Sequence, residues 1–399
     1  MSQAVQAEEY DPFSDAVMRD PWPFYRALRE EAPVYYHPDY DTWFLSCFED
    51  IRAATVNEAL TAERGVTPEM VILKAPPPPD PVFSMLDGPR QRAHRRLFAP
   101  AYGKQAILSL EPRIRERVRA RLAPLLRQGG FDVYRDLADP VAAEIIGELI
   151  GFPAEESLEL RAFIAANFKR EPGQKGNDAK NSEAQMAVMI RIAGLIAARQ
   201  EHGGSGESGD HLSVMLGAEI DGKPLSMETM VASAYTLLVT GAEVVPLSVA
   251  NTIYYLADHP DQRSRLTGDP TLIPHAFAES LRFDQPTNLL GRVVQAETEI
   301  RGQRLSPGQG VMFLWASGNR DESEFVDADR FDIMRRPKRS LSYGHGVHKC
   351  IGEHLGNLEG RILLEEILAA APNYRVNKPE AERVYSEFLH GYHRMPIEF

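Results

Sequence analysis

The sequence predicts a mainly helical protein with a smaller β-rich part. Apolar side chains recur at i, i+3 and i+4 through most of residues 90–216, which is the periodicity of amphipathic helices. Residues 226–259 form the longest apolar-periodic segment of the chain. Shorter segments rich in β-branched and aromatic residues, at 34–47, 292–305 and 308–317, are typical of strands and hairpins.

The N-terminal half contains both types of element. Residues 21–33 have a helical pattern, and residues 34–47 place a turn-like HPDYD between two β-prone segments, which favours a hairpin. In the following loop, KAPPPPDPV at residues 74–82, successive prolines exclude a helix and favour an extended polyproline path. The polar runs 169–183 and 202–210 interrupt helical patterns, which indicates surface connections.

Residues 226–259 predict one long, buried helix. Ser226 is a suitable N-cap residue, and Glu228 lies in the first turn, where its charge suits the helix dipole. At 1.5 Å per residue the helix would be roughly 50 Å long, enough to cross the whole protein. Its middle is apolar on nearly every face, which indicates burial. Further helices are predicted over residues 274–283 and 356–371.

Length and composition exclude several classes of protein. The 399 residues leave the number of domains open, and 43% apolar with 25% charged residues is typical of a globular protein. A net charge of -13 argues against broad affinity for nucleic acid. The first residues lack a signal-peptide pattern, and no window reaches the ~18 uninterrupted apolar residues of a membrane span. We therefore expect a cytoplasmic protein whose two cysteines, Cys47 and Cys350, stay reduced.

Cys350 lies in YGHGVHKCIG, residues 343–352, between a glycine-rich turn and a helix predicted to begin near Ile351. Free N–H groups and the dipole at a helix start stabilise a thiolate, and glycines let backbone amides and a flat cofactor approach the sulfur. Two other interpretations remain open, a small buried apolar residue and a zinc ligand. The zinc site would consist of His345, His348, Cys350 and His354.

The same stretch resembles the haem-binding signature of the cytochrome P450 monooxygenases, Phe-Gly-x-Gly-x-His-x-Cys-x-Gly. The resemblance implies that Cys350 is the axial thiolate ligand of haem iron and that His348 binds a haem propionate. It also implies that Gly344 and Gly352 make room for haem. Only the first position departs, because Tyr343 replaces the usual phenylalanine and brings a hydroxyl that needs a partner if it is buried.

Two further segments match the family in the expected order. Glu279 and Arg282 in ESLR resemble its Glu-x-x-Arg pair, and their i, i+3 spacing places both charges on one helix face. FVDADRF resembles the segment before the cysteine loop, although Ala328 stands where proline is usual. The resemblance implies that Arg330 completes a buried ion network with Glu279 and Arg282.

A third segment, residues 87–102, resembles the Asp-x-Pro segment that opens the helix running under the haem edge. By this match Arg95 binds a haem propionate, and Gln91 stands at a cofactor-binding position where histidine is frequent. Arg292 in LGRVV matches another propionate-binding position. Charge-assisted bonds from arginine and histidine suit two carboxylates in a partly buried site.

The resemblance covers nearly the whole chain. It implies a single cytochrome P450 domain over residues 1–399, with haem b between the long central helix and the helix that follows the cysteine loop. It also implies a monooxygenase: haem-bound dioxygen takes up two electrons and two protons, one oxygen atom enters a hydrophobic organic substrate, and water leaves. The electrons would come from NAD(P)H through a ferredoxin, and we expect a monomer.

The central helix departs from the family pattern Ala/Gly-Gly-x-Asp/Glu-Thr at residues 240–245. Glu243 retains the catalytic acid, but Val244 replaces the threonine and cannot relay a proton. Pro246 further removes a helical N–H nearby. We expect ordered water, Glu243 or a substrate hydroxyl to deliver protons. The alternatives are an enzyme that uses peroxide, a haem reaction without O–O protonation, and a haem-binding protein without catalysis.

The resemblance also locates a substrate pocket. Its walls would be the loop 67–85, the loop around Phe168, the central helix and two later segments, which are mostly apolar. A pocket of this kind predicts a medium-sized hydrophobic organic substrate. The residues from the central helix and the later segments are Leu237, Thr240, Gly241, Thr287, Asn288, Leu289, Leu290, Phe388 and Leu389.

Basic side chains gather around the cysteine loop, although the chain as a whole is acidic. This concentration predicts a docking patch for an acidic ferredoxin. The alternative is a solvated basic turn. The predicted patch consists of Arg92, Arg96, Arg335, Arg336, Lys338, Arg339 and Lys349.

Overall fold

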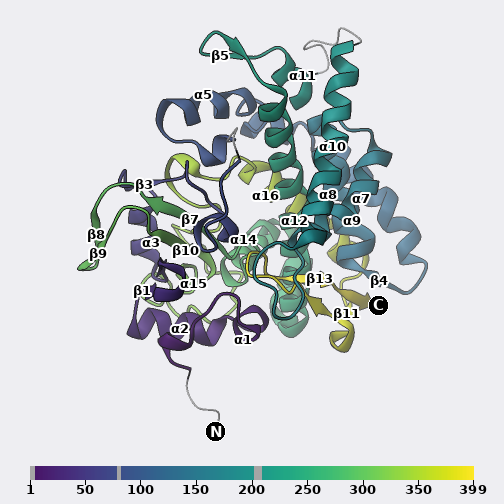
Figure 1. Cartoon of the computed structure of the whole chain (residues 1–399). Coiled ribbons are helices and arrows are strands. Elements are labelled where there is room, and N and C mark those ends of the chain that lie inside the picture. The colour runs from purple at the N-terminus through teal and green to yellow at the C-terminus, as the bar shows by residue number, and fades with distance from the viewer. Residues whose placement is uncertain (1–4, 79–81, 202–208) are drawn as a thin grey trace.

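The helix α12 (Met227–Asp258) runs through the helix-rich part of the computed structural model, which describes residues 5–78, 82–201 and 209–399 (Figure 1). Ser226 is its N-cap, and its Oγ accepts a hydrogen bond from the Thr229 N–H. Most side chains in the second half of the helix are buried. The long central helix that the apolar periodicity predicts is therefore present with nearly the predicted bounds.

Helices surround α12 and form the main hydrophobic core with it. The approach to α8 is close, because a Cβ on Gly241 would lie 2.5 Å from Ile146 Cγ1. The helices in contact with α12 include the π-helix η4 (Val133–Ala138), α8 (Asp139–Ile150), α9 (Ala154–Phe168), α10 (Ala179–Glu201), α11 (His211–Leu216), α13 (Pro260–Gly268), α14 (Ile273–Phe283) and α16 (Glu353–Ala370).

The β-rich part contains a five-stranded sheet with the strand order β1-β2-β10-β7-β3. The predicted hairpin is formed by β1 and β2, in which Val34 pairs with Leu45. β10 pairs parallel to β2 and antiparallel to β7, which brings sequence-distant segments into one sheet. The strands are β1 (Val34–His37), β2 (Thr42–Leu45), β3 (Leu60–Thr61), β7 (Leu289–Val294) and β10 (Gly310–Leu314).

The remaining elements are mostly short. The helices are α1 (Asp15–Arg19), α2 (Trp22–Glu31), α3 (Phe48–Ala54), α4 (Pro68–Val71), α5 (Gly88–Phe98), α6 (Lys104–Leu108), α7 (Glu111–Leu126), α15 (Trp315–Gly318) and the π-helix η4 (Val133–Ala138). The strands are β4 (Gly130–Asp132), β5 (Glu219–Ile220), β6 (Lys223–Pro224), β8 (Thr298–Ile300), β9 (Gln303–Leu305), β11 (Arg375–Val376), β12 (Glu382–Arg383), β13 (Tyr392–Arg394) and β14 (Pro396–Glu398). A mainly helical protein with a smaller β-rich part is thus confirmed.

Some boundaries differ from the predicted ones. α10 begins within the polar run 169–183, because Asp178 accepts a hydrogen bond from the Asn181 N–H as an N-cap residue does. Residues 74–78 of the proline-rich loop form no helix, as predicted, and the extended polyproline path stays a prediction. Residues 79–81 of that loop and 202–208 of the second polar run lie outside the described residues.

Among the described residues, α12 alone is long and apolar enough to cross a lipid bilayer. Of its most apolar 18-residue window, 67% is buried against the rest of the protein. Burial of this kind is typical of a core helix that passes the same length and composition test.

Candidate active site

The cysteine loop is a tight backbone turn in front of α16. Gly344 and Gly346 have φ angles of +69° and +74°, in the left-handed region that glycine adopts without strain. At Gly346 a side chain would also collide, since a Cβ would lie 2.9 Å from Val56 Cγ1. The Cys350 N–H donates to the Tyr343 carbonyl at 2.8 Å. The glycines therefore let the loop double back and present the sulfur.

The Cys350 side chain is exposed within the chain, yet protein atoms surround it closely. We conclude that it lines an interior space. Burial raises the pKa of its thiol, while the Gly352 N–H, which hydrogen-bonds the sulfur, and the Arg95 cation lower that pKa. α16 begins at Glu353, two residues later than predicted, and Gly352 is its N-cap residue.

The other two interpretations of Cys350, a buried apolar residue and a zinc ligand, do not fit this geometry. A small apolar core residue would be buried, whereas Cys350 is accessible. In the described part of the chain no three His, Cys, Asp or Glu side chains are placed to hold a metal ion together, so the four proposed zinc ligands do not converge. A single exposed thiol that lines an interior space can instead supply one axial ligand to a metal that a cofactor already holds.

One face of α12 opens in the middle of the core. Thr240 is exposed, and Thr236, Gly241 and Val244 are half-buried, although their neighbours along the helix are buried. Positions 236, 240 and 244 are four residues apart and share a helix face. The Thr240 hydroxyl donates to the Thr236 carbonyl at 2.7 Å. Leu237, by contrast, is 4% exposed and belongs to the main core.

This part of α12 lies against the start of α16. A Cβ on Gly356 would lie 3.5 Å from both Val245 Cγ2 and the Tyr343 hydroxyl. The Tyr343 hydroxyl donates to Asn357 Oδ1 at 3.0 Å, so it has the hydrogen-bond partner that a buried hydroxyl needs. The start of α16 and the Tyr343 side chain of the cysteine loop therefore lie close to the middle of α12.

Glu243 is buried and turned toward another helix. Its Oε2 accepts a hydrogen bond at 3.0 Å from the hydroxyl of Tyr134, which belongs to the π-helix η4. Burial and, to a smaller extent, the charge of Asp139 raise the pKa of Glu243, Tyr134 and Arg161 oppose them, and the resulting pKa is about 8. The acid is therefore mainly protonated at neutral pH.

The segment after Glu243 rearranges the hydrogen bonds of α12 without interrupting the helix. Pro246 has no N–H, so the Ala242 carbonyl lacks its usual partner one turn later. The Ser248 hydroxyl donates to the Val244 carbonyl at 2.7 Å. Val244 itself offers only methyl groups to the open face.

The three predicted propionate-binding residues lie near one another, and Asp87 lies close to two of them, His348 and Arg292. His348 Nε2 lies 3.1 Å from Asp87 Oδ1, and both Arg292 and Arg95 are close enough to lower the His348 pKa. Burial lowers the pKa of Arg292 to about 10. The described residues give its guanidinium one hydrogen bond, to the carbonyl of Gly291. Three basic groups that share one nearby carboxylate among two of them form a site that suits further anionic groups.

Two residues of α5 tie the helix to the cysteine loop. Gln91 is buried, and its Nε2 donates to the Val347 carbonyl at 3.0 Å. Arg95 Nη2 donates to the Lys349 carbonyl at 2.6 Å. Gln91 therefore positions the loop, whereas Arg95 also remains half-buried beside the sulfur. The exposed thiol, the open α12 face and the basic cluster together fit an iron porphyrin with two carboxylates.

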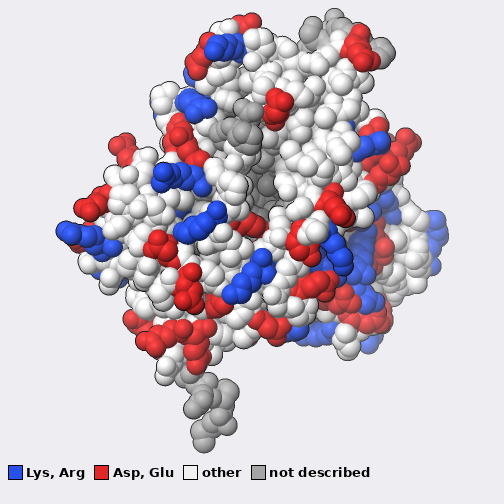
Figure 2. All heavy atoms as spheres, viewed as in Figure 1, with Lys and Arg blue, Asp and Glu red and all other residues white. Residues whose placement is uncertain are grey.

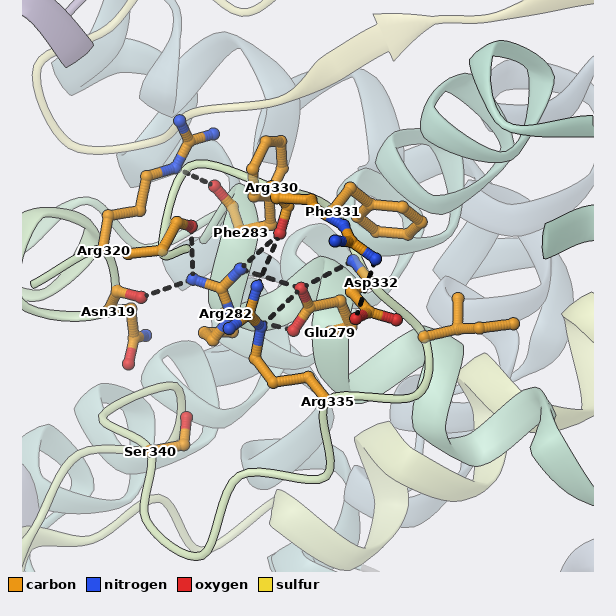
Figure 3. A network of polar contacts seen from close by, with 12 residues as sticks. Glu279, Arg282, Phe283, Asn319, Arg320, Arg330, Phe331, Asp332, Arg335 and Ser340 are labelled. Atoms are coloured by element: carbon orange, nitrogen blue, oxygen red, sulfur yellow. Dashed lines mark hydrogen bonds and ion pairs between the residues drawn. The ribbon is translucent and has the colours of Figure 1, made fainter. Parts of the chain in front are cut away.

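Glu279 and Arg282 form a buried bidentate ion pair, as predicted (Figure 3). Arg282 Nε and Nη2 each donate to a Glu279 oxygen at 2.8 Å. Arg282 Nη1 also donates to the carbonyls of Asn319 and Ala328. The pair on α14 therefore anchors the irregular segment that precedes the cysteine loop.

The prediction for Arg330 was wrong, because Arg335 is the arginine that completes the pair (Figure 3). Arg335 Nε donates to Glu279 Oε1 at 3.1 Å. The Arg330 side chain is 65% exposed and pairs with Asp332, and only its carbonyl takes part in the network. The chain folds back after Phe331, so the side chain of Arg335, five residues after Arg330, reaches the Glu279 carboxylate.

This result also corrects the predicted basic patch. The Arg335 side chain is 11% exposed and donates its hydrogen bonds to Glu279 and to backbone carbonyls, so it is not available to bind a ferredoxin. Arg339 pairs with Glu324 and Glu49, and Lys349 with Glu353, although both remain exposed. The predicted patch residues that stay exposed are Arg92, Arg96, Arg336, Lys338, Arg339 and Lys349.

The later pocket segments divide into lining and supporting residues. Thr287, Leu290 and Phe388 are half-buried, whereas Leu289 and Leu389 are buried in hydrophobic clusters. Thr287 and Leu389 pair as an isolated β-bridge. Asn288 differs from its predicted pocket-lining role, because it is buried, accepts from the Tyr25 hydroxyl and donates to the Glu387 carbonyl.

Sequence reasoning missed Tyr134 and the buried Arg170. Neither lies in a recognisable motif, and their partners are distant in the chain: Glu243 lies 109 residues from Tyr134, and Glu387 lies 217 residues from Arg170. The sequence carries no signal for Arg170, because an arginine inside a polar run is ordinary, and only the fold shows the full burial that requires carboxylate partners.

Comparison with known proteins agrees with this site. A family model described as Cytochrome P450 matches residues 271–386. Vitamin D(3) 25-hydroxylase of Pseudonocardia autotrophica is 33% identical over 397 residues, which are 98% of this chain and 96% of the relative. Putative cytochrome P450 123 of Mycobacterium tuberculosis (strain H37Rv) is 31% identical over 97% of this chain and 96% of its own length.

Solved structures have the same fold over their full length. The crystal structure of CalO2 has a TM-score of 0.85 at 29% identity, and the match covers 98% of each chain. P450BioI, solved in complex with hexadec-9Z-enoic acid ligated acyl carrier protein, has a TM-score of 0.85 at 25% identity, over 97% of this chain and 100% of that one. Both the helix-rich and the β-rich part are included in these matches.

Proposed function

We propose that this chain, which belongs to the cytochrome P450 family, is a monooxygenase that inserts one oxygen atom of dioxygen into a hydrophobic organic substrate. Its family membership makes it a haem b-binding oxidoreductase. The observation that supports the reaction best is the exposed Cys350 thiol, together with the open face in the middle of α12. We expect the chain to form one domain over residues 1–399 and to act as a cytoplasmic monomer.

Each residue around the thiol has a definite role in this proposal. Cys350 would ligate the iron, and the Gly352 N–H and the Arg95 cation would stabilise its negative charge. Arg95, Arg292 and His348 would hold the two propionates. When bound, haem supplies dioxygen activation, which electron donation from a thiolate ligand favours.

The proton supply must differ from the family pattern, because Val244 has no hydroxyl. Glu243 stores a proton: Tyr134 donates to its Oε2, which leaves Oε1 to carry the acid proton. Thr240, on the open face four residues before Val244, offers a hydroxyl oxygen that accepts hydrogen bonds while its proton is directed at Thr236. We propose that a water held at the Thr240 hydroxyl takes the place of the missing threonine.

The substitution Val244→Thr tests this proton supply. If water at Thr240 already serves, the fraction of consumed NADH that becomes product stays unchanged in the variant. A marked rise in that fraction would mean that the wild type lacks an efficient relay. The second candidate function, a peroxide-driven enzyme, rests on the same valine, and it would be favoured if hydrogen peroxide replaced NADH and ferredoxin at an equal or higher rate.

The substrate is expected to be a medium-sized apolar molecule. Phe388, Leu290 and Val244 offer apolar surface, and Thr240 and Thr287 offer the hydroxyl groups available for orientation. Two relatives set the range of size: one is named for a hydroxylation of vitamin D(3), and another was solved with a carrier-bound hexadecenoic acid. A screen of steroid-like and fatty-acid-like compounds for displacement of iron-bound water would identify the class.

For electron supply we propose NAD(P)H and an acidic ferredoxin that docks beside the cysteine loop. The exposed residues of the corrected patch support this choice, since they form a local positive surface on a chain of net charge -13. Raising the ionic strength should slow electron transfer, because salt screens exposed charges. If the rate did not depend on salt, the patch would be a solvated basic turn.

A further inference from the structure

Arg170 is among the largest side chains that the fold buries completely. Its side chain is 1% exposed, and that of its partner Glu387 is 0% exposed. Arg170 Nε and Nη2 donate to Glu387 at 3.1 and 2.8 Å, and Nη2 also donates to Glu69 at 2.7 Å. A buried guanidinium held by two carboxylates is unusual outside functional or structural networks.

The ion pairs join three segments that are far apart in the chain. Arg170 follows the end of α9, Glu69 belongs to α4, and Glu387 lies in the coil before β13. The Arg170 N–H also donates to the Tyr385 carbonyl at 2.9 Å. One residue thus fixes the α9–α10 connection, at residues 169–178, to the helix α4 and to the coil before β13.

The same segments carry the side chains expected at the substrate. Phe168, two residues before Arg170, stacks on Phe388 with ring centroids 5.7 Å apart and an interplanar angle of 15°. Asn288 extends the linkage, because its N–H donates to the Phe388 carbonyl and its Nδ2 to the Glu387 carbonyl. The ion pairs therefore set the position of the aromatic pair.

A second contact packs the α9–α10 connection against the end of α4. Gly176 has a φ of +65°, and a Cβ at this residue would lie 2.6 Å from Leu73 Cδ1. The connection and the segment after α4 lie side by side at the front of the molecule in Figure 1. Figure 2 shows that this face is hollowed near its centre.

We propose that Arg170 is a positioning residue that closes the substrate chamber, and that ligand exchange requires its ion pairs with Glu387 and Glu69 to separate. This inference rests on the proposed function of the same site. The connection and the stacked phenylalanines would move together, because the Arg170 guanidinium links the connection to Glu387, next to Phe388, and to Glu69. Glu69 is 19% exposed, so water can reach the ion pairs from its side as they separate.

Stopped-flow binding of imidazole to the ferric holoenzyme tests the proposal, because imidazole must enter the chamber to bind the iron. The variant Arg170→Met should raise the association and dissociation rate constants together, by roughly tenfold, the factor that corresponds to about 1.4 kcal/mol in an open–closed equilibrium. Arg170→Lys keeps the charge without the bidentate geometry, so its rate constants should lie between those of the wild type and those of Arg170→Met. Gly176→Ala should also speed exchange while leaving the ion pairs intact.

The matched control is Arg115→Gln. Arg115 is held by three carboxylates, Glu111, Glu365 and Glu366, on α7 and α16, away from the loops of the chamber. This variant should lose stability and leave imidazole kinetics unchanged. If the Arg170 variants behave in the same way, with lower stability and unaltered exchange of imidazole, the residue is only structural and the proposal is wrong.

Hydrogen exchange supplies a readout that does not need haem chemistry. In Arg170→Met, peptides that contain residues 169–176 and 385–390 should exchange faster, while peptides of α7 should not. Unchanged exchange in both segments would contradict the closure. Should the protein prove not to be a monooxygenase, faster exchange in these two segments would still uphold the closure itself, so the two failures can be told apart.

Discussion

Two buried guanidinium groups, Arg282 and Arg170, hold carboxylates in different regions of the molecule and under different conditions. Arg282 pairs with Glu279 on the same helix, both are nearly inaccessible, and its other bonds go to backbone carbonyls. Arg170 joins the α9–α10 connection to α4 and to the coil before β13, and its outer partner Glu69 is partly exposed. The first arrangement cannot open without exposing the core, whereas the second can open toward solvent. A buried charge can therefore be either a permanent anchor or a closure.

The largest effect should come from Arg282→Met. The change leaves Glu279 buried without its main cation and removes the anchor of the segment before the cysteine loop. The expected loss is about 3–5 kcal/mol, a large part of the free energy of unfolding of a typical protein. Denaturant unfolding would measure it, and haem should be lost in parallel. Full retention of haem and stability would remove the distinction between anchor and closure.

A buried acid without a guanidinium partner extends the comparison to Glu243. Its folded pKa of about 8 lies above the ordinary value, with Tyr134, Asp139 and Arg161 as the groups that act on it. The stability from this group is fully present below pH ~4.5 and is lost as the pH rises through about 8. Glu243→Gln should flatten the fall in the free energy of unfolding between these values. An identical pH profile for the variant would mean that Glu243 is ionised in the fold.

The third effect distinguishes Arg335 from Arg330. Arg335→Gln removes a bond to Glu279 and bonds to backbone carbonyls, so it should cost about 1–3 kcal/mol. Arg330→Gln changes an exposed side chain, so it should stay within about 0.5 kcal/mol of the wild type. Thermal unfolding of both variants measures the difference. The reverse order would restore the assignment that the sequence suggests.

The smallest effect should come from Tyr343→Phe. The variant loses one half-buried hydrogen bond, to Asn357, so about 1 kcal/mol of stability is at stake. Haem should remain bound, and the reduction potential is the property to measure for a shift. Loss of haem would instead give the hydroxyl a structural role.

The sequence predicts local features far better than contacts between distant segments. The ion pair Glu279–Arg282 is three residues apart on one helix, and the long helix shows its cap and its apolar faces directly, so both were predicted correctly. Arg335 was misassigned because the fold-back after Phe331 has no signal in the sequence. The partners of Arg170 and Tyr134 depend on packing between elements, which no periodicity reveals.

The cysteine loop shows the same division. Its glycines and Cys350 follow one another in the chain, so the turn and the thiol could be predicted from residue order alone. The bonds of Gln91 and Arg95 to the loop carbonyls join positions more than 250 residues apart, and only the three-dimensional structure gives them.

The central claim is that Cys350 is the axial thiolate ligand of a bound haem. The most direct measurement is the absorption spectrum of the reduced protein with carbon monoxide, together with the matched variant Cys350→His. The account predicts a strongly red-shifted Soret band for the wild type and its loss in the variant, with the protein still folded. A wild-type spectrum without that band, or a band that survives the loss of the thiol, would contradict it.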